Sequence, residues 1–465
     1  MADYDDMLVR VQRKGLVGAD AQVYTAELWL QGGRHLNERT EVRLADYSEP
    51  TSSDPRAIAA AGLDLFNRLF AGPLAIAFHQ AWAAARARGR TLRLRLALDP
   101  GAPALHAIPW ELMHFDDSGG LSIPRPLATD PGIVFSRYIE SASFDEGRPI
   151  AERPIRMLAV LSSPSDLPRW NLAPLEKEID GRDLQTRFSA AVASGQFRVD
   201  FLPAATEAAL HEALARGSLD GEAARGYDVL LYYGHALFHP EDGTRLVLED
   251  AETGRVHLYD GDELIGQLQK LPPDHRPSLV VLVACNSATT GPLNSLATRI
   301  MIEGGVPAVM AMQRLVEVAL ARAFTHHLSE HLLRDGTIDM AVSVARRRVF
   351  QPDSLSWSTP VLYMRNADGR LFSPNAQLEY VDWVLRSPDF VRWDSPEFIE
   401  LGVLSVAPGQ DWNLLRARPE DAPSSVGALE AIDRALDLGL RPQRRYEEHA
   451  ASRRTNLAAL IGPPQ

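Results

Sequence analysis

The sequence predicts an α/β protein with a mostly parallel sheet that carries helices on both faces. The central part alternates short apolar runs with stretches of helical periodicity, which is the pattern of a parallel sheet covered on both sides. An α/β segment with a less regular pattern precedes this part, and a shorter, mainly helical segment follows it. We therefore predict three regions: an N-terminal α/β domain at 1–145, a central domain at 146–372, and a regulatory or docking extension at 373–465.

The N-terminal region contains strand and helix patterns of its own. Val23–Gln31 and Thr91–Pro100 alternate apolar and polar residues, which is typical of half-buried strands. Between them, residues 55–88 carry apolar side chains at helical spacing, and Gly72-Pro73 divides this stretch into two helices. Around Ser143–Pro154 the composition turns polar, with two prolines and a glycine. We interpret that segment as a linker.

The central region contains six strand-like runs, and helical runs separate most of them. The strands are expected at Ile155–Ser163, Phe197–Pro203, Tyr227–His235, Ser278–Cys285, Val306–Met312 and Thr359–Arg365. The helices are expected at Leu172–Ala193, Thr206–Arg216, Leu293–Glu303, Val316–Leu333 and Asp339–Val349. In an open parallel sheet, functional residues gather where the strands end at their carboxyl side.

Composition excludes several classes of function. The formal net charge of −13 argues against direct nucleic-acid binding, which needs a basic surface. Apolar runs are too short to cross a bilayer, and the acidic start of the chain does not have the pattern of a signal peptide, so we expect a cytoplasmic protein that does not contact membranes. The single cysteine excludes an internal disulfide and a multi-thiolate zinc site.

Two strand ends carry the residues of a nucleophilic site. His235 and Cys285 each follow an apolar run and each precede a loop. Parallel strands joined by one crossover can be neighbours, which would bring an imidazole close to a thiol at one edge of the sheet. A thiolate is a strong nucleophile and a histidine can move its proton, whereas a free cysteine elsewhere is usually a small buried hydrophobe. We therefore predict Cys285 as nucleophile and His235 as acid and base.

Several segments together resemble a CHAT domain, a member of the caspase, separase and gingipain group of cysteine peptidases. They include "YDVLLYYGHA", "LVVLVACNSATTG", "STPVLYMR" and the N-terminal "LRLRLALDPGAPALHAIPWELMH". The resemblance covers roughly Thr91–Arg365 and implies a caspase-like fold and endopeptidase activity with no cofactor. It implies a His235/Cys285 dyad and an oxyanion hole made of the backbone N–H groups of Cys285 and Ala236. The usual Gly-His-Gly pattern is Gly234-His235-Ala236 here.

The resemblance also implies a substrate and a mode of regulation. Related peptidases often place carboxylates under a basic P1 side chain, and Asp166 and Glu317 are the candidates for pairing with arginine or lysine. A solvated loop acid and a glutamate at a helix N-terminus are the alternative interpretations of these two residues. The substrate would be another protein, and the activator a sensor or a protease, in a prokaryotic immune or cell-death pathway.

Other interpretations remain open at the level of sequence. The chain could be an inactive CHAT scaffold that docks a partner protein. More remotely, "HLSEH" fits the H-x-x-E-H pattern of zinc peptidases, with His327 and His331 on one helix face. In "WELMH", Glu111 and His114 resemble half of a di-iron motif, although a capped helix or a core histidine suits a single copy better. A flavodoxin-like protein would need a glycine-rich loop after the first central strand, and 162–170 contains no glycine.

Overall fold

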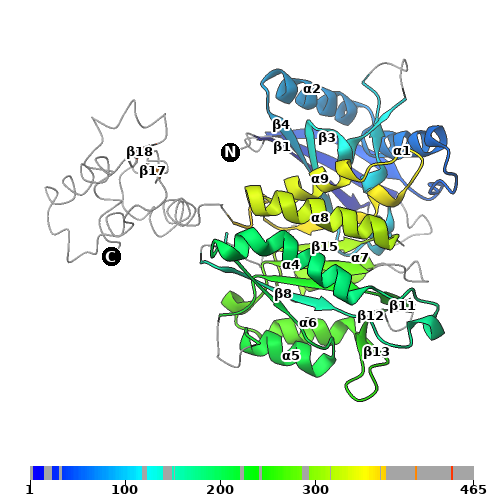
Figure 1. Ribbon diagram of the computed structural model, residues 1–465. Coiled ribbons are helices and arrows are strands. Elements are labelled where there is room, and N and C mark those ends of the chain that lie inside the picture. Colours follow the sequence, from blue (N-terminus) through cyan, green and yellow to red (C-terminus); the bar gives the residue numbers. More distant parts are fainter. Residues whose placement is uncertain are drawn as a thin grey trace, which may run out of the picture. The chain divides into compact units, whose positions relative to one another are not determined.

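The computed structural model describes most of the chain up to residue 372 (Figure 1). The described residues are 4–14, 23–30, 34–117, 123–139, 149–150, 152–219, 225–239, 243–284, 293–314, 316–366, 368–372, 404–405 and 441–442. The chain divides into one compact unit of Met1–Arg148 with Arg153–Leu371, and a second of Pro149–Glu152 with Phe372–Gln465. In the second unit the described strands β17 (Leu404–Ser405) and β18 (Arg441–Pro442) pair antiparallel. The remainder of the predicted helical extension lies outside the described residues.

The first unit is built on an eleven-stranded sheet in the order β3-β2-β1-β4-β7-β16-β15-β14-β10-β8-β9. Seven of its ten strand pairs are parallel, so the predicted mostly parallel sheet is confirmed. Its strands are β1 (Tyr4–Arg13), β2 (Val23–Leu30), β3 (Arg34–Arg43), β4 (Thr91–Leu98), β7 (Ile133–Tyr138), β8 (Ile155–Leu161), β9 (Phe197–Phe201), β10 (Val229–Gly234), β14 (Leu279–Ala284), β15 (Ala308–Met312) and β16 (Pro360–Met364).

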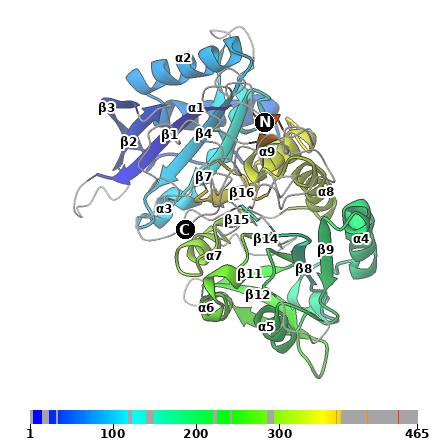
Figure 2. The ribbon, with the colours of Figure 1, turned by 90° about the vertical axis from the view of Figure 1, so that its left-hand side faces the viewer.

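Helices cover both faces of this sheet. Figure 2 shows α4, α8 and α9 on one face of the central strands and α5, α6 and α7 on the other. Strands β8, β10, β14, β15 and β16 are buried at every position, as continuous apolar runs between two helical layers should be. The helices are α1 (Pro55–Leu69), α2 (Pro73–Ala87), α3 (Pro103–Ala107), α4 (Lys177–Ala193), α5 (Glu207–Arg216), α6 (Gly261–Lys270), α7 (Leu293–Ile302), α8 (Val318–Asp335) and α9 (Ile338–Arg348).

The N-terminal strands and the central strands belong to the same sheet. Strand β16 pairs antiparallel with β15 on one side and parallel with β7 on the other, where Tyr363 faces Arg137 and Met364 faces Tyr138. Of the predicted linker at Ser143–Pro154, residues 143–148 and 151 lie outside the described residues. A domain boundary at that point therefore stays a prediction, and what the structure adds is a sheet that continues across it.

Two buried arginines and one glutamate lie beside this junction of β7 and β16. Oε1 of Glu111, in the 3-10 helix Trp110–Leu112, accepts from Arg137 Nε at 3.1 Å, and Arg346 Nη2 lies 3.8 Å from the same oxygen. The three side chains have no exposed surface. Arg137 also donates to the Tyr363 hydroxyl at 3.1 Å. Glu111 of "WELMH" therefore acts as the counter-ion of the two buried arginines and not as a metal ligand.

Two buried histidines near this cluster make folding sensitive to acid. Burial lowers the pKa of His106 to about 4, with a further contribution from Arg137, and burial lowers the pKa of His114 to about 4. Because the folded state disfavours their protonation, their stabilising contribution is complete above pH 6.5 and is lost as the pH falls from 6.5 towards 4. We expect a loss of roughly 2 kcal/mol per histidine at pH 5.

Urea unfolding between pH 7.5 and 5 measures this loss. The matched variant is His106→Gln with His114→Gln, which removes both titrating groups and should reduce the loss of stability at pH 5 by roughly 4 kcal/mol, twice the value for one histidine. Parallel pH profiles for the wild type and the double variant would contradict the prediction.

Candidate active site

The two strands that carry the predicted dyad are neighbours. Strands β10 and β14 pair in parallel from Val229 opposite Leu279 to Gly234 opposite Ala284. His235 is the residue after Gly234, and Cys285 is the residue after Ala284. The predicted adjacency of these strands is confirmed. Cys285 itself lies outside the described residues, as do 286–292.

A backbone carbonyl orients the imidazole of His235. Its Nε2 lies 2.7 Å from the carbonyl oxygen of Ala173, in the loop before α4, and the side chain is fully buried. A carbonyl oxygen only accepts hydrogen bonds, so Nε2 must carry the proton. In the neutral ring Nδ1 then holds the lone pair that can take a proton from a nucleophile.

The loop that carries Ala173 is fixed by apolar packing and by polar contacts. Leu167 and Leu172 form a small core cluster with Val247 of β12 (Gly243–Glu249). Ser162 Oγ donates to the carbonyl of Val247 at 2.6 Å. The strand end of β8 and the loop after it are therefore held against β12, and the carbonyl of Ala173 is held with them.

The main chain at His235 is held from two sides. The Tyr232 hydroxyl lies 2.6 Å from the His235 carbonyl oxygen and 2.9 Å from that of Val247, and the Val247 N–H donates to His235 at 3.0 Å. The Tyr232 ring passes so close to Gly234 that a Cβ there would lie 2.7 Å from its Cζ. Glycine at 234 is therefore required by the approach of this ring.

Ala236 begins an edge strand next to His235. Strand β11 (Ala236–His239) pairs antiparallel with β12, which pairs with β13 (Val256–Asp260), in a separate three-stranded sheet. The hydrogen bond from Val247 to His235 makes that pair a hydrogen-bonded one, so the next pair, Ala236 with Leu246, is not. The Ala236 N–H consequently points away from β12, a direction compatible with its predicted place in an oxyanion hole.

The two carboxylates predicted for a P1 pocket lie in different settings. Asp166 is half-buried before the 3-10 helix Leu167–Trp170, and its Oδ1 accepts from Val256 N at 2.7 Å. Glu317 is exposed at the start of α8 and makes no side-chain cap. Asp166 thus joins its loop to β13. This long-range contact could not be predicted from the sequence. Binding of a basic P1 side chain by either residue stays a prediction.

A second pair of carboxylates lies just after Ala173 and was not foreseen. Arg322 of α8 binds Asp180 of α4, with Nε 2.8 Å from Oδ1, and its Nη2 lies 3.4 Å from Glu176. Asp180 is only 4 % exposed. This ion pair joins α8 to the first turn of α4 and so helps to fix the segment that orients His235.

The "HLSEH" segment does not group as the H-x-x-E-H pattern suggests. His331 Nδ1 lies 3.5 Å from Asp335, and its Nε2 accepts from Arg334 Nη2 at 3.1 Å. The potential metal ligands that come together are instead His326, His327 and Glu330. The remote alternative of a zinc site on His327 and His331 gains no support from these contacts, because both nitrogens of His331 face other partners.

Comparison with known proteins places the chain in a family. The family model for the CHAT domain matches residues 60–391, which is more than half of the sequence. With its mostly parallel sheet and its histidine at a strand end, the protein belongs to the CHAT domain family.

Comparisons with solved structures and with curated protein sequences give weaker similarities than the family model. Two structures of the Saccharomyces cerevisiae separase–securin complex, at 3.0 and 2.6 Å resolution, share 14% and 17% identity with TM-scores of 0.29 and 0.32. Each match covers 59% of this chain and only 15% or 16% of the other. No curated protein sequence matches. Among the described residues, no helix is both long and apolar enough to span a bilayer.

Proposed function

We propose that the protein is a cysteine endopeptidase with a Cys285/His235 dyad. The supporting observation is the register of β10 and β14, whose last paired residues, Gly234 and Ala284, immediately precede the two predicted catalytic residues. Parallel strands lie about 4.8 Å apart, and residues in register project from the same face. A continuation of the ladder by one residue would bring the thiol and the imidazole side by side.

The proposed reaction begins with transfer of the Cys285 thiol proton to His235 Nδ1. The thiolate attacks the scissile carbonyl carbon, and the N–H groups of Cys285 and Ala236 bind the oxyanion that forms. The intermediate collapses, the C–N bond breaks, and the imidazolium gives its proton to the leaving amine. His235 then takes a proton from water, whose oxygen attacks the thioester and releases the acid and the thiol. The Nε2 bond to Ala173 keeps the ring oriented so that Nδ1 is the nitrogen that accepts and releases the proton.

The proposal extends to substrate and regulation through family membership. We infer a protein substrate cleaved after arginine or lysine, with Asp166 and Glu317 as the proposed carboxylates of the P1 pocket. Control by a sensor protein or by a protease, a cytoplasmic setting, and a role in a prokaryotic immune or cell-death pathway belong to the same proposal. A docking scaffold without activity is the second candidate, and it predicts an unreactive Cys285.

A fluorogenic peptide library that varies P1 tests the activity. Wild type and Cys285→Ala are compared with and without a chelator, before and after limited trypsin nicking. Hydrolysis that requires Cys285 and ignores the chelator would support the peptidase, and its P1 preference would test the basic pocket. Hydrolysis that persists in Cys285→Ala would overturn the dyad. If every arm is silent, alkylation of Cys285 is measured in wild type and His235→Ala, and equal rates would favour the scaffold.

A further inference from the structure

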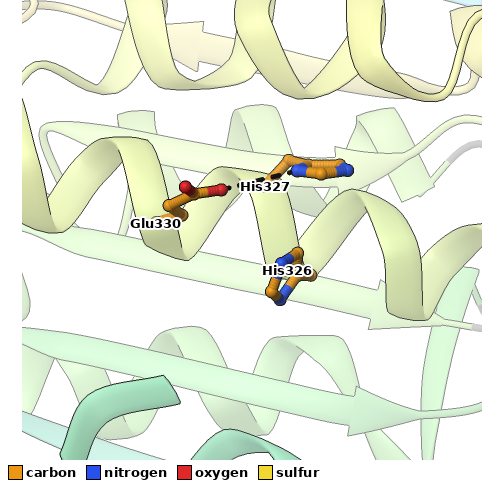
Figure 3. A group of neighbouring side chains, drawn as sticks. All are labelled: His326, His327 and Glu330. Carbon is orange, nitrogen blue, oxygen red and sulfur yellow. Dashed lines mark ion pairs between the residues drawn. The ribbon is translucent and has the colours of Figure 1, made fainter.

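We propose that α8 carries a binding site for a divalent transition metal of the zinc class, formed by His326, His327 and Glu330 (Figure 3). This site is separate from the proposed dyad and adds a function that the peptidase proposal does not contain.

The helix itself brings the three donors together. His326 is four residues and His327 three residues before Glu330, and these are the two spacings that place side chains next to each other on a helix. The two imidazole rings have centroids 5.0 Å apart, and their ligand atoms and those of Glu330 all lie within 4.8 Å of one another. Figure 3 shows the carboxylate of Glu330 reaching towards His327.

The distances suit a tetrahedral ion. A metal at about 2.0–2.2 Å from nitrogen and oxygen ligands separates those ligands by about 3.3–3.6 Å. His327 Nδ1 and Glu330 Oε2 are already 3.6 Å apart. His326 is exposed, so its ring can turn about the side-chain bonds to complete the third contact.

The donor set selects the kind of ion. Two imidazoles with one carboxylate suit Zn²⁺ and its neighbours Ni²⁺ and Cu²⁺, whereas Mg²⁺ and Ca²⁺ prefer sites made only of oxygen. Three protein ligands leave the fourth position of a zinc ion to water.

The site faces solvent, on the side of α8 that does not pack on the sheet. Thr325, Leu328 and Ser329 of the same helix are buried, and they line a small cavity of about 30 Å³ against the sheet. His326 and Glu330 are exposed, so an ion can reach the site without opening the fold. His331 lies on the same helix but contacts Asp335 and Arg334. It is therefore a histidine outside the proposed site and can serve as a control.

Isothermal titration with ZnCl₂ tests the proposal. The titration uses the full chain with Cys285→Ala, because a thiol near an imidazole could bind zinc by itself. Glu330→Gln and His326→Ala should each weaken zinc binding by at least ~10-fold, since second-shell changes alone cost that much in known sites. His331→Ala is the matched control and should leave the affinity unchanged.

Three results would overturn the metal site. They are no zinc binding by the wild type, binding that disappears with Cys285→Ala, and binding that is equal in Glu330→Gln and in the parent. None of these outcomes depends on peptide hydrolysis, so failure of the metal site and failure of the peptidase proposal are distinguishable. Circular dichroism spectra of the variants verify that loss of binding is not loss of folding.

Discussion

Replacing Glu111 with glutamine is expected to lower the free energy of unfolding by about 3–5 kcal/mol, the usual cost of removing one partner of a buried ion pair. Glu111 is the counter-ion that approaches both Arg137 and Arg346, and none of the three side chains is exposed. Glutamine keeps the shape and one acceptor oxygen but removes the charge, so two guanidinium groups would remain buried without an anion. Urea unfolding followed by circular dichroism measures the change.

The effect should be large because the cluster joins segments that are far apart in the chain. Arg137 of β7 donates to the carbonyl of His106 at 2.8 Å and to Oε1 of Gln313, at the end of β15, at 2.9 Å. It also contacts Tyr363 of β16. One guanidinium thus connects the N-terminal strands to the central ones at the point where only two residue pairs join β7 to β16.

An exposed ion pair supplies the control for this experiment. Arg299 of α7 and Glu303, the residue after this helix, pair with 2.7 Å between Nε and Oε1, but their side chains are 40% and 41% exposed. Arg299→Met should therefore cost no more than about 1 kcal/mol. If Glu111→Gln lowered the free energy of unfolding by no more than Arg299→Met does, the buried cluster would not have the stabilising role assigned to it.

Sequence reasoning was strongest where a local pattern reflects burial. Leu279–Ala284 is apolar throughout, and Ile155–Leu161 is apolar except for Arg156, because both sides of each strand are covered, so the parallel centre of the sheet was predictable. The joining of the N-terminal strands to that centre was not predictable. It depends on β16 lying between β15 and β7, and such a long-range pairing leaves no periodicity in Pro360–Met364 itself.

The candidate site shows the same division. His235 could be found because a polar residue ends an apolar run, whereas the orienting group of Ala173 is a backbone carbonyl, which any residue type would supply. Asp166 had the chemistry of a pocket carboxylate, yet its partner is a main-chain N–H of Val256, 90 positions away. Helical spacing alone suggested His327 with His331 as an alternative metal pair, and spacing could not show that His331 contacts Asp335 and Arg334.

Replacing His235 with alanine is expected to lower kcat for peptide hydrolysis by about 10²–10⁴-fold, the usual contribution of a positioned general acid and base. This expectation rests on the proposed dyad. His235→Gln is the sharper variant, because its side-chain amide nitrogen can take the place of Nε2 and still donate to the carbonyl of Ala173, but it has no group that moves a proton near neutral pH. Both variants should lose activity to a similar extent if the imidazole acts chemically.

His257→Ala is the matched control for this loss. His257 lies on β13, pairs with Glu207 at 2.9 Å and is 38% exposed, so its removal should leave kcat unchanged. The rate of Cys285 alkylation at neutral pH should also fall in His235→Ala, because the thiolate would lose its proton acceptor. Full activity in His235→Gln would instead mean that the residue only orders the strand end, and another group would then have to accept the thiol proton.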